Sequence, residues 1–133
     1  MTKPTIKILI VDDDFHIRDS IRLALVEQDF VKVEISESID VASGIQQLKN
    51  LNPDIIILDL HMPDKTGFDF IDIARKDESF AQVKVIILTA DDTLDNIFQA
   101  EAKGIGAFHF LGKPFSVADL QALVLSLSLP ISK

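Results

Sequence analysis

Four short apolar runs in this 133-residue chain are each followed by side chains that can take part in phosphoryl chemistry. They are residues 6–11 before Asp12, Asp13 and Asp14, residues 55–58 before Asp59, residues 85–88 before Thr89, and residues 110–111 before Gly112, Lys113 and Pro114. If the runs are strands of a parallel sheet, their carboxyl ends lie along one edge, where such sheets bind ligands. The carboxylates, the hydroxyl and the ammonium group would then meet in one cleft suited to a divalent cation and a phosphoryl group.

The three consecutive aspartates have two readings. Asp12, Asp13 and Asp14 could form a solvated turn that caps the next helix, and for this segment alone that reading is as good as a metal site. A cap needs only one acid, however, and two carboxylates about 4 Å apart repel by about 4 kcal/mol at an effective dielectric constant of about 20. A bound cation removes this repulsion. Oxygen ligands without His or Cys select Mg²⁺, with Mn²⁺ as the alternative.

Asp59 is the more specific signal. A carboxylate that ends an apolar strand is partly desolvated, and a nearby cation and Lys113 would keep it ionised. Such a carboxylate can attack phosphorus and form an acyl phosphate. The alternative is that Asp59 caps the next helix, but the helical pattern resumes only at Gly67 and Phe68.

Thr89 and Lys113 complete the predicted site. A threonine hydroxyl can donate to a phosphoryl oxygen. Lys113 precedes Pro114, which holds it away from the helical region, so its side chain extends from an extended backbone. The three histidines, His16, His61 and His109, have no metal-ligand spacing.

Composition predicts one packed domain over residues 1–133, with a core from about residue 5 to 129. The net charge of −8 argues against direct nucleic-acid binding. The absence of Cys excludes disulfides and thiol chemistry. No apolar run approaches the roughly 20 residues that span a bilayer, and the N-terminus does not resemble a signal peptide. We therefore expect a cytoplasmic protein without membrane insertion and, after residue 130, no output domain.

The apolar runs alternate with helical spacing, which predicts a (βα)5 order and a doubly wound α/β fold with a five-stranded parallel sheet. Residues 31–35 alternate as a half-buried strand does, which suits a position at or near the edge of the sheet. Helical patterns follow Asp14 and cover Val41 to Leu48, Phe68 to Ala74 and Leu94 to Phe98. Ser116 is the predicted N-cap of the last helix, whose buried stripe is Leu120, Leu123, Val124 and Leu127.

At these motifs the chain resembles the response-regulator receiver domain of two-component signalling, a member of the CheY-like superfamily. The matching segments are ILIVDDD at 8–14, ILDLHMP at 57–63 with Gly67, ILTA at 87–90 and GKPF at 112–115. The resemblance covers almost the full length. It implies a flavodoxin-like fold with strand order 2-1-3-4-5.

The resemblance also implies a role for each residue of the acidic site. Asp59 would accept a phosphoryl group from the phosphohistidine of a histidine kinase. Asp13 and Asp59 would bind Mg²⁺ directly, together with the backbone carbonyl of His61, and Asp12 would act through water. Thr89 and Lys113 would bind the phosphoryl oxygens.

Three further residues follow from the same resemblance. Phe110 occupies the place of the family's switch aromatic, which turns inward when Thr89 moves toward the phosphoryl group. Unlike Tyr, it has no hydroxyl to hydrogen-bond in either position. His61 and Asp91 would flank the path of attacking water and so set the lifetime of the phosphoryl group. The stretch from Thr89 to Gly106 is longer than the family pattern.

The leading function is a phosphorylation-dependent signalling switch that changes its partner-binding face, built from helix 4, strand 5 and helix 5. It is not an enzyme beyond self-catalysed phosphorylation and dephosphorylation of its own aspartate. It would be a diffusible regulator or a phosphorelay intermediate. Its partners would be a histidine kinase or a histidine phosphotransfer protein, a downstream target protein, and a second copy in a phosphorylation-dependent homodimer.

Two other classes of protein share parts of this pattern. A haloacid-dehalogenase-type phosphohydrolase wants a second Asp two residues after the nucleophile, where this chain has His61, and a cap domain. A flavin-binding electron carrier needs a phosphate loop after the first strand, where Asp12 to Asp14 would repel the flavin phosphate.

Overall fold

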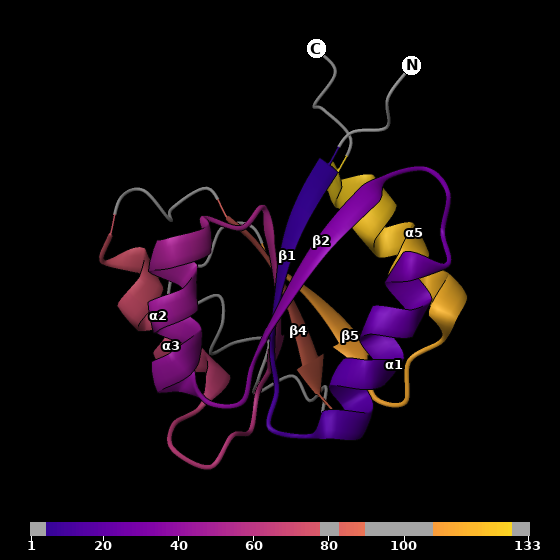
Figure 1. The fold of residues 1–133 in the computed structure, drawn as a ribbon. Coiled ribbons are helices and arrows are strands. Elements are labelled where there is room, and N and C mark those ends of the chain that lie inside the picture. The colour runs from indigo at the N-terminus through magenta and orange to yellow at the C-terminus, as the bar shows by residue number, and fades with distance from the viewer. Residues whose placement is uncertain (1–4, 78–82, 90–107, 129–133) are drawn as a thin grey trace.

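The computed structural model describes residues 5–77, 83–89 and 108–128. The described part of the chain contains five strands and four helices (Figure 1). In chain order the elements are β1 (Thr5–Val11), α1 (Phe15–Val26), β2 (Lys32–Ser38), α2 (Val41–Leu51), β3 (Ile55–Asp59), α3 (Gly67–Arg75), β4 (Lys84–Thr89), β5 (Phe108–Gly112) and α5 (Val117–Ser128). The helix predicted from the pattern Leu94 to Phe98 lies outside the described residues.

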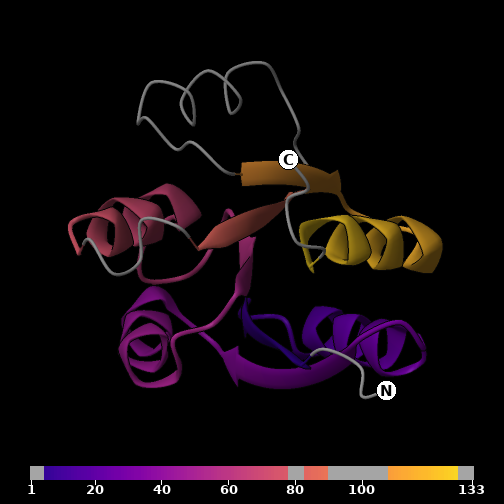
Figure 2. The same cartoon turned by 90° about the horizontal axis from the view of Figure 1, so that it is seen from above.

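All strand pairs are parallel, and the sheet has the order β2-β1-β3-β4-β5. Helices α1 and α5 cover one face of the sheet, and α2 and α3 cover the other, as Figures 1 and 2 show. The prediction of a doubly wound α/β fold with this strand order is confirmed. No described helix has the length and apolarity needed to cross a bilayer.

The central strands are apolar because both of their faces are covered. All five residues of β3 are buried. In β2, at the edge of the sheet, the first four residues alternate between exposed and partly buried, and only Ser38 at its end is buried. The predicted edge strand is therefore confirmed. Side chains alternate between two cores: Ile56 and Leu58 of β3 pack toward α2 and α3, and Ile57 packs toward α1 and α5.

Local caps explain where the helices begin. Asp14 accepts a hydrogen bond from the amide of His16 and caps α1. Thr66 and Asp69 form a reciprocal capping box at the start of α3. Ser116 Oγ accepts the amide of Asp119 at 2.9 Å, as the sequence predicts. Each of these helices is the next element after a strand, so each cap lies near the carboxyl ends of the strands.

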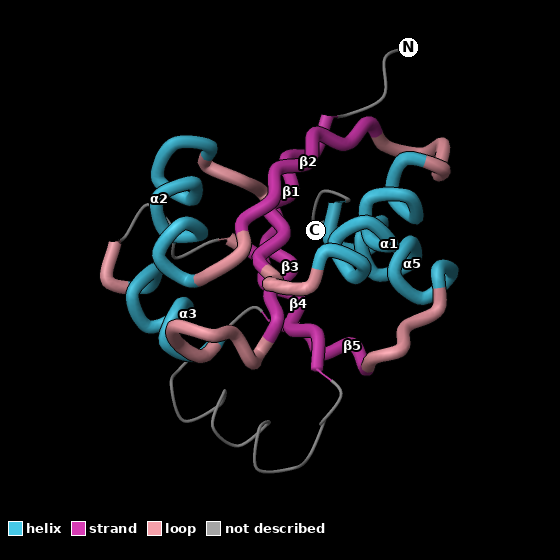
Figure 3. Tube along the Cα trace, turned by 60° about the horizontal axis from the view of Figure 1, so that its bottom comes forward, coloured by secondary structure: helices cyan, strands magenta, loops and turns pink. Residues whose placement is uncertain are grey.

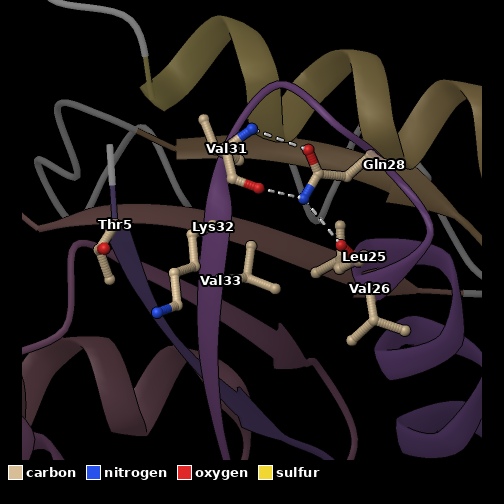
Figure 4. A pocket seen from close by; sticks show the side chains of 7 residues that line it. All are labelled: Thr5, Leu25, Val26, Gln28, Val31, Lys32 and Val33. Carbon is tan, nitrogen blue, oxygen red and sulfur yellow. Dashed lines mark hydrogen bonds between the residues drawn. The ribbon is translucent and has the colours of Figure 1, made fainter. Parts of the chain in front are cut away.

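The turn between α1 and β2 lies at the opposite end of the strands, where their amino termini are. The side-chain amide of Gln28 binds the carbonyls of Leu25 and Val31 and accepts the amides of Phe30 and Val31. Figure 4 shows this clamp beside a hollow of about 600 Å³ that also borders Thr5, the first residue of β1. This hollow lies at the amino ends of the strands, away from the predicted site.

Candidate metal centre

Three carboxylates meet where β1 and β3 end. One carboxylate oxygen each of Asp12, Asp13 and Asp59 lies within 4.8 Å of the other two. Asp12 and Asp59 are buried, with 1% and 6% of their surface exposed, while Asp13 faces solvent. Figure 3, turned to bring the carboxyl ends of the strands forward, shows why: β1 and β3 are neighbours in the sheet. The cluster combines residues almost fifty positions apart.

The three consecutive aspartates divide the two predicted roles among them. Asp14 is the helix cap, and its backbone amide donates to Asp12 Oδ1 at 2.9 Å. The Asp12 amide in turn donates to the carbonyl of Ser38 at 3.0 Å, which fixes this turn to β2. Since one acid serves as the cap, Asp12 and Asp13 remain available to the cluster.

Arg18 also holds this turn, and the sequence analysis missed it. Its Nη1 donates to the Asp12 carbonyl at 2.8 Å, and its Nε to Glu37 Oε1 at 2.9 Å. Arg22 binds the other oxygen of Glu37 at 2.6 Å. An arginine on a helix after an acidic turn usually reads as a surface charge, so only the pairing of α1 with the end of β2 reveals this contact.

Lys113 reaches the cluster from the end of β5. Its Nζ lies 3.1 Å from Asp59 Oδ1 and 3.2 Å from Asp12 Oδ2, and its side chain is 19% exposed. The backbone amide of Lys113 donates to the carbonyl of Thr89 at 2.9 Å, and the Lys113–Pro114 peptide is cis. The lysine predicted from sequence therefore contacts both buried acids.

The charges in this cluster are incompletely balanced. Burial raises the pKa of Asp12; the Asp14 amide opposes this effect, and the charge of Asp59 adds to it. For Lys113, burial alone would lower the pKa, but the two carboxylates outweigh burial and raise it. Lys113 therefore stays protonated, and three carboxylates against one ammonium leave excess negative charge when all are ionised.

This donor set fits a hard divalent cation. The ligand atoms are carboxylate oxygens, and Mg²⁺ takes one or two carboxylates from a protein while keeping several waters. Asp12, Asp13 and Asp59 would hold the ion. When bound, it would supply positive charge that offsets the carboxylates.

The loop from Leu60 to Thr66 follows β3, and its two ends are hydrogen-bonded to each other. His61 and Thr66 form an antiparallel bridge, and the Gly67 amide donates to the Leu60 carbonyl at 2.8 Å. A Cβ atom on Gly67 would lie 2.7 Å from the Asp59 carbonyl oxygen, so only glycine fits here. Because α3 starts at Gly67, Asp59 does not cap that helix.

The remaining predicted residues have different surroundings. Thr89 is buried at the end of β4, directly opposite Gly112 in the register with β5. Phe110 is partly buried and packs against the core under α2 and α3. His61 is exposed on the loop after β3. Asp91 lies outside the described residues.

Asp64 is a second residue that the sequence analysis missed. Its carboxylate accepts the amides of Val41 and Ala42, at 3.1 and 3.2 Å, in the first turn of α2. The Val41 amide is the main cause that lowers the pKa of Asp64; burial opposes it, and the Ala42 amide adds to it. The contact joins residues more than twenty positions apart, which no local sequence pattern reveals.

Comparison with known proteins agrees with this geometry. Residues 8–125 match the family described as "Response regulator receiver domain". The chain is 38% identical over 116 residues to the KDP operon transcriptional regulatory protein KdpE of Escherichia coli, covering 86% of this chain and 48% of KdpE. It is 33% identical to the DNA-binding dual master transcriptional regulator RpaA of Synechocystis, covering 91% of this chain and 48% of RpaA. The chain thus spans about half the length of the curated relatives it matches.

Solved structures show the same fold over whole chains. Chemotaxis protein CheY4 of Vibrio cholerae superposes with a TM-score of 0.81 at 26% identity, covering 92% of this chain and 98% of CheY4. A putative response regulator from Chloroflexus aurantiacus gives a TM-score of 0.82 at 25% identity, covering 94% and 98%. The family match over residues 8–125 and the carboxylate cluster at the ends of β1 and β3 lead to one conclusion. The chain belongs to the response regulator receiver domains, the phosphorylation-dependent signalling modules of two-component systems.

Proposed function

We propose that Asp59 accepts a phosphoryl group from the phosphohistidine of a histidine kinase or a histidine phosphotransfer protein. An Asp59 carboxylate oxygen forms a bond to phosphorus as the phosphorus–nitrogen bond of the donor breaks. The leaving imidazole takes up a proton from water. The downstream target is a protein that distinguishes the phosphorylated from the unphosphorylated chain.

One observation carries this proposal. Asp59 ends a wholly buried strand, yet its carboxylate lies 3.1 Å from a lysine ammonium and beside two further carboxylates. A buried acid that only stabilised the fold would need one partner and would gain nothing from two like charges nearby. An acceptor that must bind both a cation and a phosphoryl group needs these neighbours.

The neighbouring residues support particular roles. Asp13 and Asp59, with the backbone carbonyl of His61, would bind Mg²⁺ directly, and Asp12 would bind it through water. Mn²⁺ has the same hard-ligand preference. In the unphosphorylated protein the Lys113 ammonium binds the carboxylates of Asp12 and Asp59. After phosphorylation of Asp59 it would bind a phosphoryl oxygen instead, because it already lies within hydrogen-bond distance of that residue. Thr89 would donate its hydroxyl to a second phosphoryl oxygen. His61 and Asp91 would affect the lifetime of the acyl phosphate.

Phe110 is the proposed switch residue, and the face of α5 and β5 is part of the proposed output surface. Residue 110 pairs with Ile87 in the strand register, two positions before Thr89. A Thr89 drawn toward a phosphoryl group would leave space that the Phe110 ring can occupy. A phosphorylated chain could present this face to a target or to a second copy.

Partner binding at the site itself is supported by exposed apolar side chains. Phe15, Ile39 and Val117 are 57%, 57% and 48% exposed. Each lies shortly after the end of a strand, at the same edge of the sheet as Asp59. They offer apolar area to a phosphodonor protein beside the acceptor carboxylate.

Phosphorylation with a small donor tests the assignment. We expect acetyl phosphate with Mg²⁺ to add one base-labile phosphoryl group, detected as an intact-mass increase, and Asp59→Asn to abolish it. Asp54→Asn is the matched control, because Asp54 accepts the Lys7 amide at the opposite end of the strands. Stoichiometric labelling of Asp59→Asn would show that another residue is the acceptor.

A further inference from the structure

Two acids from different parts of the chain bind the first turn of α2. Asp40, the residue before the helix, accepts the Ser43 amide at 2.8 Å. Asp64 accepts the two preceding amides, those of Val41 and Ala42. The first turn of α2 is therefore capped partly by its own connection and partly by the loop that follows β3.

Asp64 anchors the middle of that loop to α2. The two ends of the loop are joined to each other by the bridge between His61 and Thr66 and by the hydrogen bond from the Gly67 amide to the Leu60 carbonyl. Between these contacts Met62 is partly buried, whereas Pro63 to Thr66 are exposed. The two bonds to α2 thus hold the exposed part of the loop on a second element.

Helix α2 is a firm support for this loop. A Cβ atom on Gly44 would lie 2.8 Å from the Phe70 ring and 3.1 Å from both methyl groups of Val11, so the helix is seated directly on β1 and α3. Val11 immediately precedes Asp12. The same helix therefore contacts the strand that carries Asp12 and, through Asp64, the loop that carries His61.

We infer that Asp64 is a positioning residue that couples the cation site to the first turn of α2 by fixing the loop after β3. The inference rests on the proposed function, in which the His61 carbonyl and the neighbouring carboxylates hold Mg²⁺. With both ends of the loop fixed, the His61 backbone keeps one position. Without the Asp64 contacts, part of the energy of cation binding is spent on ordering the loop, which weakens binding.

Coupling of this kind is reciprocal, so it has two readouts. Asp64→Ala should raise the Mg²⁺ dissociation constant by about tenfold, as loss of supporting contacts around metal ligands does. Asp64→Asn should raise it less, because its amide oxygen can accept from Val41 or Ala42 but its nitrogen cannot. Conversely, Mg²⁺ should slow hydrogen exchange of the Val41 and Ala42 amides in the wild type and leave them unchanged in Asp64→Ala.

Asp40→Ala is the matched control. It also removes one negative charge and one cap from the start of α2, but within the described residues the hydrogen bonds of Asp40 go to Ser43 and Gly44 of its own helix. We expect its Mg²⁺ dissociation constant to stay within about twofold of the wild type. The affinities are measured by calorimetry and the exchange by amide NMR.

The outcomes separate this inference from the proposed function. Equal loss of Mg²⁺ affinity in Asp40→Ala and Asp64→Ala would overturn the coupling, because helix stability or charge would then explain both. Unchanged Val41 and Ala42 exchange in the wild type on Mg²⁺ binding would also overturn it, even if Asp64→Ala fails to fold. A wild type that binds no Mg²⁺ and is not phosphorylated would instead refute the proposed function.

Discussion

Lys113→Met should destabilise the metal-free protein and at the same time strengthen its binding of Mg²⁺. The substitution keeps an unbranched apolar side chain but removes the ammonium group between Asp12 and Asp59. Without the ammonium, the three clustered carboxylates face one another with no positive charge from this lysine. The opposite signs of the two effects make the prediction specific.

The two ion-pair distances set the magnitude of the destabilisation. At 3.1 and 3.2 Å, each ion pair contributes about 5 kcal/mol of attraction at an effective dielectric constant of about 20. Desolvation of the lysine offsets much of this attraction. Removing one partner of a buried pair costs about 3–5 kcal/mol, and because Lys113 is 19% exposed, we expect the lower value. The melting temperature should then fall by about 10 °C.

The second effect follows from the same charges. The ammonium repels a cation bound at the carboxylates, so its removal should lower the Mg²⁺ dissociation constant by about fivefold or more. Saturating Mg²⁺ should accordingly stabilise Lys113→Met by more than it stabilises the wild type. Part of the stability lost in the metal-free variant is regained when the ion binds.

Urea unfolding followed by far-ultraviolet circular dichroism measures both effects, because the chain has no Trp or Tyr to report by fluorescence. The titrations are run with a chelator and with saturating Mg²⁺. Lys49→Met, an exposed lysine in the last turn of α2, is the matched control. Equal costs for Lys49→Met and Lys113→Met, or weaker Mg²⁺ binding by Lys113→Met, would refute the electrostatic reasoning.

Three further predictions concern the acids and the loop. Gly67→Ala should lose about 2 kcal/mol of stability, because its methyl group meets the Asp59 carbonyl at 2.7 Å; urea unfolding measures this, and an unchanged midpoint would contradict the close approach. Asp13→Asn should raise the metal-free melting temperature and remove most of the stabilisation by Mg²⁺, since it relieves repulsion but deletes a ligand; a lower metal-free melting temperature would mark Asp13 as a structural cap. The pKa of Asp64 is lower in the folded than in the unfolded state, so its contribution to stability is complete above about pH 4 and is lost as the pH falls through the folded-state pKa. The stability difference between wild type and Asp64→Asn should therefore shrink on acidification, and a difference that grows toward low pH would rule this out.

Local patterns were sufficient to predict most of the scaffold. The apolar runs of β1, β3 and β4 are strands because a covered parallel sheet needs both of their faces apolar. The Ser116 cap and the edge position of β2 could also be predicted from the sequence, since each depends on residues close together in the chain. From the parallel strand order alone, one can then predict that Asp12, Asp59 and Lys113 lie close together.

The supporting contacts of the site could not be predicted in this way. Arg18 binds a carbonyl, and Asp64 binds two amides of a distant helix turn. Every residue has a backbone carbonyl, and every residue except proline has a backbone amide. The residue types therefore do not indicate which of these groups is the partner. These contacts depend on the separation of α1, α2 and the loops, which packing of the whole chain determines.

The ends of β4 and β5 have a consequence for how this chain can vary in evolution. Thr89 pairs with Gly112 across the two strands, and the Lys113 amide binds the Thr89 carbonyl. The backbones of Thr89 and Lys113 are thus aligned by the sheet, whatever number of residues connects them. Insertions and deletions between positions 90 and 107 can accumulate without moving the Thr89 backbone relative to the Lys113 backbone. In an alignment of relatives, this connection is where gaps should concentrate, while the spacing from Gly112 to Lys113 should stay constant.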